Sequence, residues 1–304
     1  MAEYYNIQLT TEDMAPIERA HLHRGFSSKK TPLKWIRFFR MCVLQRELSL
    51  KKRKKKTNTL WIAYFIIAIA MIFLVPGYWF IVNIILFVVV LVMDVRNRRE
   101  FSKNYTDGYD FFSDYFSALF TLIEEELPQL GTIHFTANVK ETLAGVEHLK
   151  SSADATFETS GFISGKEEFY EKEIGQGYCT LKDGAEVSFS FVEKVRKRII
   201  KKKGLSGKRK TKEKYKSVYP FILKLKLPKS IYQLKADIDK SDIQLEEDES
   251  FYYMKARRKF DVKDENPDDY SAYQYNSTPL FSVEYFSLEV VNLFNICYGC
   301  FTLK

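Results

Sequence analysis

Hydrophobic and polar positions follow three patterns along the chain, and each pattern predicts a different structure. From Leu60 to Met93 no residue is charged over 34 positions, which is typical of apolar helices. From Phe112 to Leu127 apolar side chains recur every three or four residues, which predicts an amphipathic helix. From Thr132 onward several segments alternate apolar and polar residues, which predicts β-strands.

The uncharged block predicts a two-helix transmembrane hairpin. A single helix of 34 residues would be about 50 Å long, more than a hydrocarbon layer of roughly 30 Å needs. Pro76-Gly77 is a turn signal that divides the block into spans at residues 58–75 and 78–95. The competing interpretation is a buried helical hairpin of a soluble protein, but soluble helices keep a polar face that these segments lack.

Cations flank both predicted spans. The positive-inside rule therefore predicts a multi-pass protein of the inner (plasma) membrane with both termini in the cytoplasm. The predicted membrane-surface residues are Lys51, Lys52, Arg53, Lys54, Lys55, Lys56, Arg96, Arg98 and Arg99. Asn83 is the lone amide in the second span. It is a candidate for a hydrogen bond between helices, within one hairpin or between copies of the chain; the alternative is that it has no role in helix association.

The remaining segments complete a predicted α+β membrane protein. Residues 1–57 form a cytoplasmic arm, irregular up to residue 31, and a basic amphipathic helix that lies on the membrane surface or packs on the C-terminal domain. Residues 96–130 form a juxtamembrane amphipathic helix. Residues 131–304 form a cytoplasmic domain of mainly antiparallel strands, flanked by amphipathic helices.

Charge is distributed unevenly along the chain. Residues 1–216 contain 36 Lys and Arg against 25 Asp and Glu, whereas residues 217–304 contain 11 against 14. The excess of cations in residues 1–216 favours anionic partners such as phospholipid or nucleic acid. Four cysteines in 304 residues do not form a disulfide scaffold and indicate reduced thiols.

The densest cation cluster predicts a basic β-hairpin over residues 194–216. Thirteen of these 23 residues are Lys or Arg, and Gly204 and Gly207 mark a turn at the centre. A cluster this dense predicts an anionic partner, and three kinds are possible: inner-leaflet lipid, nucleic acid or a nucleotide, and the acidic segments 237–249 and 261–269 of the same chain. The remaining possibility is a solvated surface hairpin that binds no partner. The candidate anion-binding residues are Lys194, Arg196, Lys197, Arg198, Lys201, Lys202, Lys203, Lys208, Arg209, Lys210 and Lys212.

No catalytic signature accompanies these features, so we expect no catalytic residues, metal site or cofactor. Cys297-Tyr-Gly-Cys300 comes at the end of a predicted helix, whereas redox cysteines usually lie at a helix N-terminus. The leading hypothesis is a non-enzymatic, membrane-anchored sensor or assembly subunit whose cytoplasmic domain binds an anionic partner. The alternatives are an oligomeric pore-forming or membrane-disrupting effector, and a membrane-tethered enzyme. We expect membrane lipid as a partner and a homo-oligomer or a subunit of a membrane complex, while the ligand and the number of copies stay open.

Overall fold

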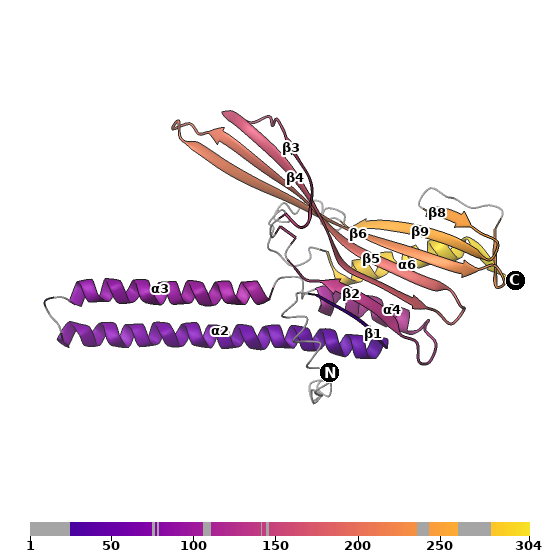
Figure 1. The fold of residues 1–304 in the computed structure, drawn as a ribbon, viewed down its shortest axis with the longest axis horizontal. Helices are drawn as coiled ribbons and strands as arrows, with labels where there is room; N and C mark the ends of the chain where they lie inside the picture. The colour runs from indigo at the N-terminus through magenta and orange to yellow at the C-terminus, as the bar shows by residue number, and fades with distance from the viewer. Residues whose placement is uncertain are drawn as a thin grey trace.

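The computed structural model describes residues 25–74, 77, 79–105, 111–140, 142–143, 146–235, 243–260 and 281–304. It shows a large antiparallel sheet with helices packed on one face, and a long arm of two helices that projects from this domain (Figure 1). The first 24 residues of the predicted N-terminal arm lie outside the described residues. So do the acidic segment 261–269 and the first part of the acidic segment 237–249, which were candidate counter-charges.

The sheet has eight antiparallel strands. Seven follow the order β1-β2-β4-β5-β6-β9-β8, and the eighth, β3, pairs with the part of β4 that precedes the segment paired with β2. Two short strands, β7 and β10, pair separately. The bounds are β1 Gly25–Lys30, β2 Ile133–Asn138, β3 Leu149–Asp154, β4 Phe162–Thr180, β5 Glu186–Lys203, β6 Arg209–Pro228, β7 Tyr232–Leu234, β8 Ile243–Glu247, β9 Phe251–Phe260 and β10 Phe301–Leu303. Residues 25–30, which we expected to be irregular, instead form the edge strand β1.

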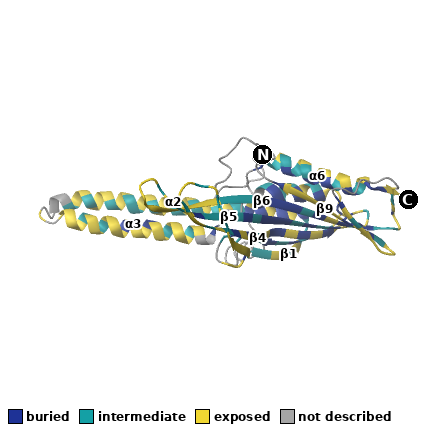
Figure 2. Cartoon of the chain, turned by 90° about the horizontal axis from the view of Figure 1, so that it is seen from above, coloured by how far each residue is buried: buried dark blue, intermediate teal, exposed yellow. Residues whose placement is uncertain are grey.

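Helices cover only one face of this sheet. They are a π-helical turn η3 (Phe112–Phe116), α4 (Ser117–Glu124), α6 (Val283–Gly299) and the first turns of α2 (Pro32–Leu74). The aromatic stripe predicted from the sequence is packed inside this layer. In Figure 2 buried positions alternate with exposed ones along the strands, and α6 is exposed on its outer side. The stripe is Phe112, Tyr115, Phe116, Leu119, Phe120, Ile123 and Leu127.

The start of α2 belongs to this core. Trp35 is completely buried, and its indole Nε1 donates a hydrogen bond of 2.9 Å to the carbonyl of Ile133 in β2. Phe39 stacks on Phe112 with ring centroids 5.5 Å apart. Of the two positions considered for this basic helix, the structure therefore shows packing on the domain.

The arm consists of α2 and α3 (Trp79–Asn104), which lie side by side in opposite directions (Figure 1). α2 continues without a break for 43 residues, about 65 Å at the usual rise. Trp61 of α2 contacts Phe87 of α3, with ring centroids 5.8 Å apart. Many apolar side chains on the outer part of the arm are exposed, among them Ile62, Phe65, Ile66, Phe80, Ile81 and Ile85.

The predicted two-helix transmembrane hairpin is wrong. Among the described residues only one helical segment, Trp79–Ser102, is long and apolar enough to cross a membrane, and length and composition alone are weak grounds for a span. The multi-pass location in the inner membrane therefore has no support either. In the structure the first predicted span is part of the longer helix α2, which also contains the cation run Lys51–Lys56. Local sequence does not reveal that one helix runs through both.

Four strands extend beyond the helices as a twisted projection, which we call the ribbon (Figure 1). It comprises β3 and the paired parts of β4, β5 and β6 at residues 162–173, 192–203 and 209–219. Gly204 and Gly207 form the turn at its tip, and Gly207 has a φ of +76°. A left-handed φ favours glycine because other residues pay a steric cost there.

Gly175 provides a test of the core. A Cβ atom at this position would lie 2.6 Å from Cζ of Phe116 and 2.8 Å from Cζ of Phe135, and both rings are fully buried. We expect Gly175→Ala to lower the free energy of unfolding by about 1–3 kcal/mol, because the packed rings have no room to move. Urea unfolding followed by circular dichroism measures this change. Gly299→Ala is the control, because a Cβ there meets no atom within 4 Å, and its effect should stay within about 1 kcal/mol.

Candidate anion-binding face

The alternation of side chains along β5 divides the predicted basic cluster between two faces of the ribbon. Successive residues of a strand point to opposite sides. Val187, Phe189 and Phe191 face the helices and are buried. Arg196, Arg198 and Lys202 have the opposite parity and therefore point away from the helices, on the face that stays open to solvent.

The register of β5 with β6 places cations directly opposite cations on this open face. Arg196 lies opposite Lys216, Arg198 opposite Lys214, and Lys202 opposite Lys210. We call these residues, together with Lys212, the basic face. Like charges directly opposite each other on neighbouring strands are unfavourable. The basic face is therefore a place where a bound anion would relieve repulsion.

Two glutamates of β4 neutralise only part of the open face. Glu167 Oε1 accepts from Arg198 Nε at 2.5 Å, and Glu171 Oε2 accepts from Lys194 Nζ at 2.6 Å. Within the part of the chain that the structure describes, no carboxylate lies within ion-pair distance of Lys202, Lys210, Lys212 or Lys214. These four ammonium groups are therefore available to a partner.

The other face of the ribbon, which we call the neutralised face, has carboxylates beside some of its cations. Lys197 lies 3.4 Å from Glu213, and Lys172 lies 3.5 Å from the buried carboxylate of Glu193. Thr142 also donates a hydrogen bond to Glu193. Of the predicted anion-binding residues, Lys197, Lys201, Lys203 and Arg209 belong to this face by strand parity, and Lys208 lies in the turn at the tip.

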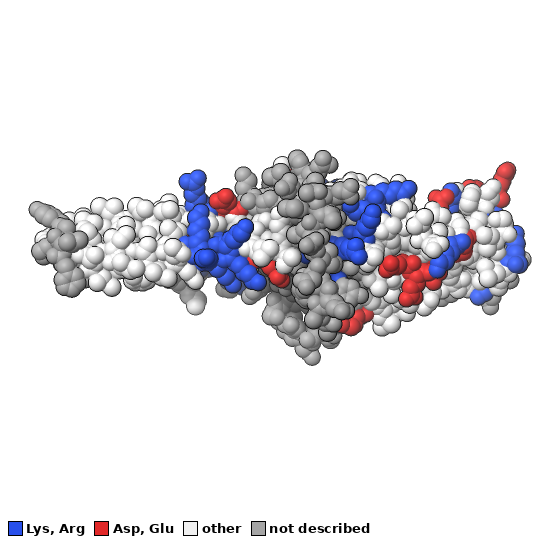
Figure 3. All heavy atoms as spheres, turned by 90° about the horizontal axis from the view of Figure 1, so that it is seen from below, with Lys and Arg blue, Asp and Glu red and all other residues white. Residues whose placement is uncertain are grey.

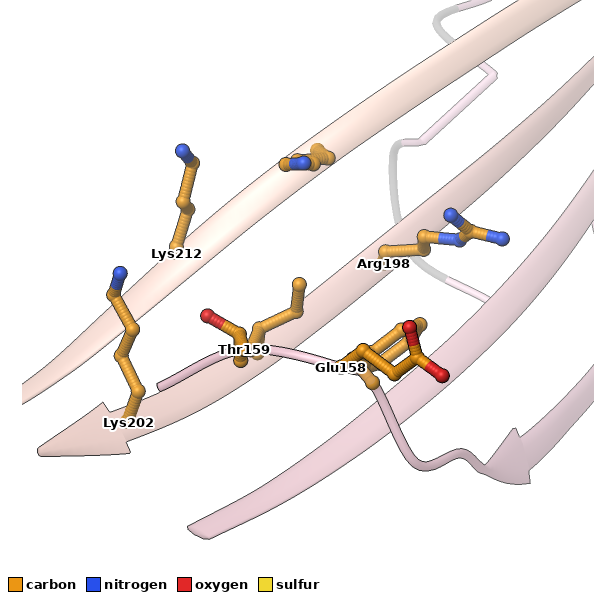
Figure 4. A pocket seen from close by; sticks show the side chains of 8 residues that line it. Glu158, Thr159, Arg198, Lys202 and Lys212 are labelled. Carbon is orange, nitrogen blue, oxygen red and sulfur yellow. The ribbon is translucent and has the colours of Figure 1, made fainter. Parts of the chain in front are cut away.

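A hollow of about 260 Å³ opens on the basic face near the tip (Figure 4). The segment that precedes β4 arches over the ribbon here, and Phe157 covers Gly165, where a Cβ would be 2.4 Å from the ring. The guanidinium of Arg198 lies 5.4 Å from the centre of the Phe157 ring. The lining consists of Phe157, Glu158, Thr159, Arg198, Ile200, Lys202, Lys212 and Lys214.

Two further hollows continue along the same face. One of about 400 Å³ has Phe169 as an aromatic wall and five cations around it, namely Lys150, Lys194, Arg196, Lys216 and Lys259. The other, of about 240 Å³, lies over the body of the sheet and is lined by polar groups and by Tyr178. The ring of Tyr178 stacks on His134 with centroids 4.8 Å apart.

The predicted membrane-surface cations also lie together, on the arm. The run Lys51–Lys56 in α2 and the group Arg96, Arg98 and Arg99 in α3 form one basic zone, visible in Figure 3 next to an uncharged outer part of the arm. Arg98 is paired with the buried carboxylate of Asp94 at 2.7 Å. Whether this zone contacts lipid stays a prediction.

The polar contacts between α2 and α3 involve residues that the sequence analysis did not select. Thr57 donates a hydrogen bond of 3.0 Å to Asp94, and Asn97 donates one of 3.1 Å to Thr57. Asn83 instead donates to the carbonyl of Trp79 in its own helix, at 2.9 Å. The predicted role of Asn83 in helix association is not visible in this contact.

Other candidate chemistry is sparse in the described residues. Cys297 and Cys300 are free thiols, and burial raises the pKa of Cys297 to about 12, so this thiol is protonated at neutral pH. Within the described ranges no three His, Cys, Asp or Glu side chains gather in a way that would hold a metal ion. The basic face is therefore the strongest candidate site.

The sequence analysis did not select several residues of the basic face and of the hollows on the same side of the sheet. Lys214 and Lys216 fall in the predicted hairpin but were not selected, and Lys150 and Lys259 come from distant segments. Phe157 and Phe169 lie in stretches that carried no strand prediction. Period-two alternation within residues 194–216 was a usable signal for the first pair, because it separates the two faces without any structure.

His148 supplies a pH test of the neutralised face. Burial lowers the pKa of His148, and the unfolded chain therefore binds a proton that the folded chain resists. The resulting stability is present above the unfolded pKa of about 6.5 and is lost as the pH falls below it. We expect the free energy of unfolding to fall less between pH 7 and pH 5.5 in His148→Gln than in the wild type. Parallel urea titrations measure it; equal slopes would contradict this assignment.

No family model, no characterised protein and no solved structure matches this chain. Its function is therefore argued from the charges, hollows and strand geometry of the chain itself.

Proposed function

We propose that this is a non-enzymatic binding protein for a phosphate-bearing partner and that the basic face of the ribbon is its binding surface. The observation that carries the proposal is the register of β5 with β6, which aligns three cation pairs on one open face. Phosphate oxygens accept hydrogen bonds from Lys and Arg and also supply the missing counter-charge. The partner has phosphate groups, which a nucleic acid, a nucleotide or a lipid headgroup would supply.

The arrangement of charge supports a specific surface rather than a general attraction to anions. The register of β5 with β6 places three cation pairs on the basic face, whereas on the other face it places one, Lys203 opposite Arg209. Glu213 and Glu193 also lie beside cations of that other face. A partner that responded only to net charge would not distinguish the two faces. A partner bound in the hollows of the basic face would.

Charge neutralisation on the basic face tests the proposal. The quadruple variant Lys202→Gln, Lys210→Gln, Lys212→Gln and Lys214→Gln removes the four available cations. We expect the salt dependence of binding to a single-stranded oligonucleotide to become shallower, with the slope of log K against log salt falling by about 3. Gel-shift titrations of the full chain over a salt series measure this slope, and vesicle co-sedimentation with and without anionic lipid measures the lipid alternative.

The matched control removes four cations elsewhere on the ribbon. Lys201→Gln, Lys203→Gln, Lys208→Gln and Arg209→Gln change the net charge equally but act on the neutralised face and the turn. This variant should keep most of the affinity of the wild type. Equal losses in both variants, or no binding to any phosphate-bearing probe by the wild type, would refute a binding role for the basic face.

The acidic residues of the open face provide the opposite test. Glu167 and Glu171 engage Arg198 and Lys194, so the double variant Glu167→Gln and Glu171→Gln frees two cations for the partner. We expect the affinity for the same phosphate-bearing probe to rise about fivefold, in keeping with the modest strength of exposed ion pairs. Fluorescence anisotropy at fixed salt measures the change.

Glu186→Gln and Glu247→Gln form the control for this gain of affinity. These two carboxylates pair with Lys226 and Lys229 at the far end of the sheet, and their loss changes the net charge by the same amount. Affinity should stay close to that of the wild type. A similar gain in both variants would show that total charge, and not the basic face, decides binding.

A further inference from the structure

We infer that the partner is a single strand of nucleic acid that lies along the open face of β5, with unpaired bases stacked on exposed aromatic rings. This inference rests on the proposed function, because the same face supplies the phosphate contacts. It adds the identity of the partner, and it predicts a binding path longer than the basic ribbon. Three observations carry it: the linear order of the hollows, the exposed rings inside them and the polar groups at the end of the path.

The three hollows follow one another along a single strand. On the open face β5 presents Ile200 and Lys202 in the first hollow, Lys194 and Arg196 in the second, and Ser188 and Ser190 in the third. β5 is unbroken over this stretch, and the 14 steps from Ser188 to Lys202 correspond to about 48 Å. A path of this length suits an extended polymer better than a single compact ligand.

Aromatic rings interrupt the cations along this path. Phe169, 41 % exposed, lies opposite Arg196 and lines the second hollow. Tyr178, 55 % exposed, lies opposite Ser188 and lines the third hollow. Single-stranded sites combine a cationic groove with aromatic rings on which bases stack, and each stacked base contributes about 1–3 kcal/mol. A lipid headgroup would use the cations but would gain nothing from rings at these positions.

The polar end of the path fits base edges. The third hollow contains the hydroxyl groups of Ser188, Ser190 and Thr136 and the amide of Gln176 around the ring of Tyr178. Hydroxyl and amide groups donate to and accept from the unpaired edges of bases. Duplexes hide these edges and the faces of the bases, so the geometry favours a single strand.

A charge-neutral variant tests the stacking role. Phe169→Leu combined with Tyr178→Leu removes both rings and leaves every cation in place. We expect the affinity of the full chain for a fluorescent oligonucleotide of about 12 nucleotides, a length within common single-strand site sizes, to fall at least tenfold. Binding to inorganic polyphosphate, which has phosphates and no bases, should change by less than about twofold, because it uses only electrostatic contacts.

Tyr253→Leu is the matched control. Tyr253 is also exposed, at 38 %, and donates a hydrogen bond of 2.7 Å to Asp248 at the far side of the sheet, outside the path. This variant should bind the oligonucleotide as tightly as the wild type. Circular dichroism of all three proteins checks that each is folded.

The outcomes separate this inference from the proposed function. Equal losses for the oligonucleotide and for polyphosphate, or no loss for either, would overturn the stacked single strand while leaving phosphate binding by the basic face intact. Tighter binding to a duplex of the same length, or binding to anionic vesicles alone, would also overturn it. Failure of the wild type to bind oligonucleotide, polyphosphate and anionic vesicles would remove both the inference and the proposed function.

Discussion

The unbroken register between β5 and β6 is the constraint on which the rest of the structure depends. Glu186 pairs with Lys226 at one end and Lys203 with Arg209 at the other, and no residue is inserted between them. Every second residue of β5 therefore points to the same side of the sheet along its whole length, and in the body of the sheet this side faces the helices. A slip of one residue would expose Phe189 and Phe191 and bury the cations, so burial of these rings also determines which cations face solvent.

The cation pairs of the basic face repel each other and oppose folding, and the core has to offset this repulsion. Two unit charges about 5 Å apart repel by about 1 kcal/mol in water and about 3 kcal/mol at the effective dielectric near a protein surface. Exposed ion pairs such as Glu171 with Lys194 return at most about 1 kcal/mol each. The layer around Phe135, Phe191 and Phe286, which buries these rings completely, is the compensating source of stability.

Sequence patterns predict the strands that alternate cleanly and miss those that do not. β5 and β9 have apolar residues at every second position and were predicted. β4 was missed because Gly175, Gly177 and several glutamates interrupt the alternation of apolar and polar residues. The two glycines are needed because the rings of Phe116, Phe135 and Phe189 leave no room for a Cβ atom. Helical periodicity of residues 112–127 was sufficient because all of its apolar positions face one core.

The errors about the arm have a physical cause as well. A stretch without charge indicates only that burial in lipid or protein is affordable, and a cation run does not end a helix. The continuation of α2 through Lys51–Lys56 is supported by contacts that this helix makes with α3 and, at Trp35, with β2, and local sequence does not reveal these contacts. For the candidate site, the cation cluster was predictable, whereas its division into two faces required the register, and its aromatic walls required the fold.

The exposed rings on the open face are the most informative feature of the site, because they lie in the same hollows as the cations. Among the residues that the structure describes, most large aromatic side chains of the domain are buried on the helix side, where each contributes about 2 kcal/mol or more. Phe169, 41 % exposed, and Tyr178, 55 % exposed, forgo a large part of that contribution. Both lie on the strand that pairs with β5 and both line hollows of its open face. Cations alone would bind any anion. Cations that alternate with aromatic rings along two paired strands favour a polymer that has both phosphates and flat bases.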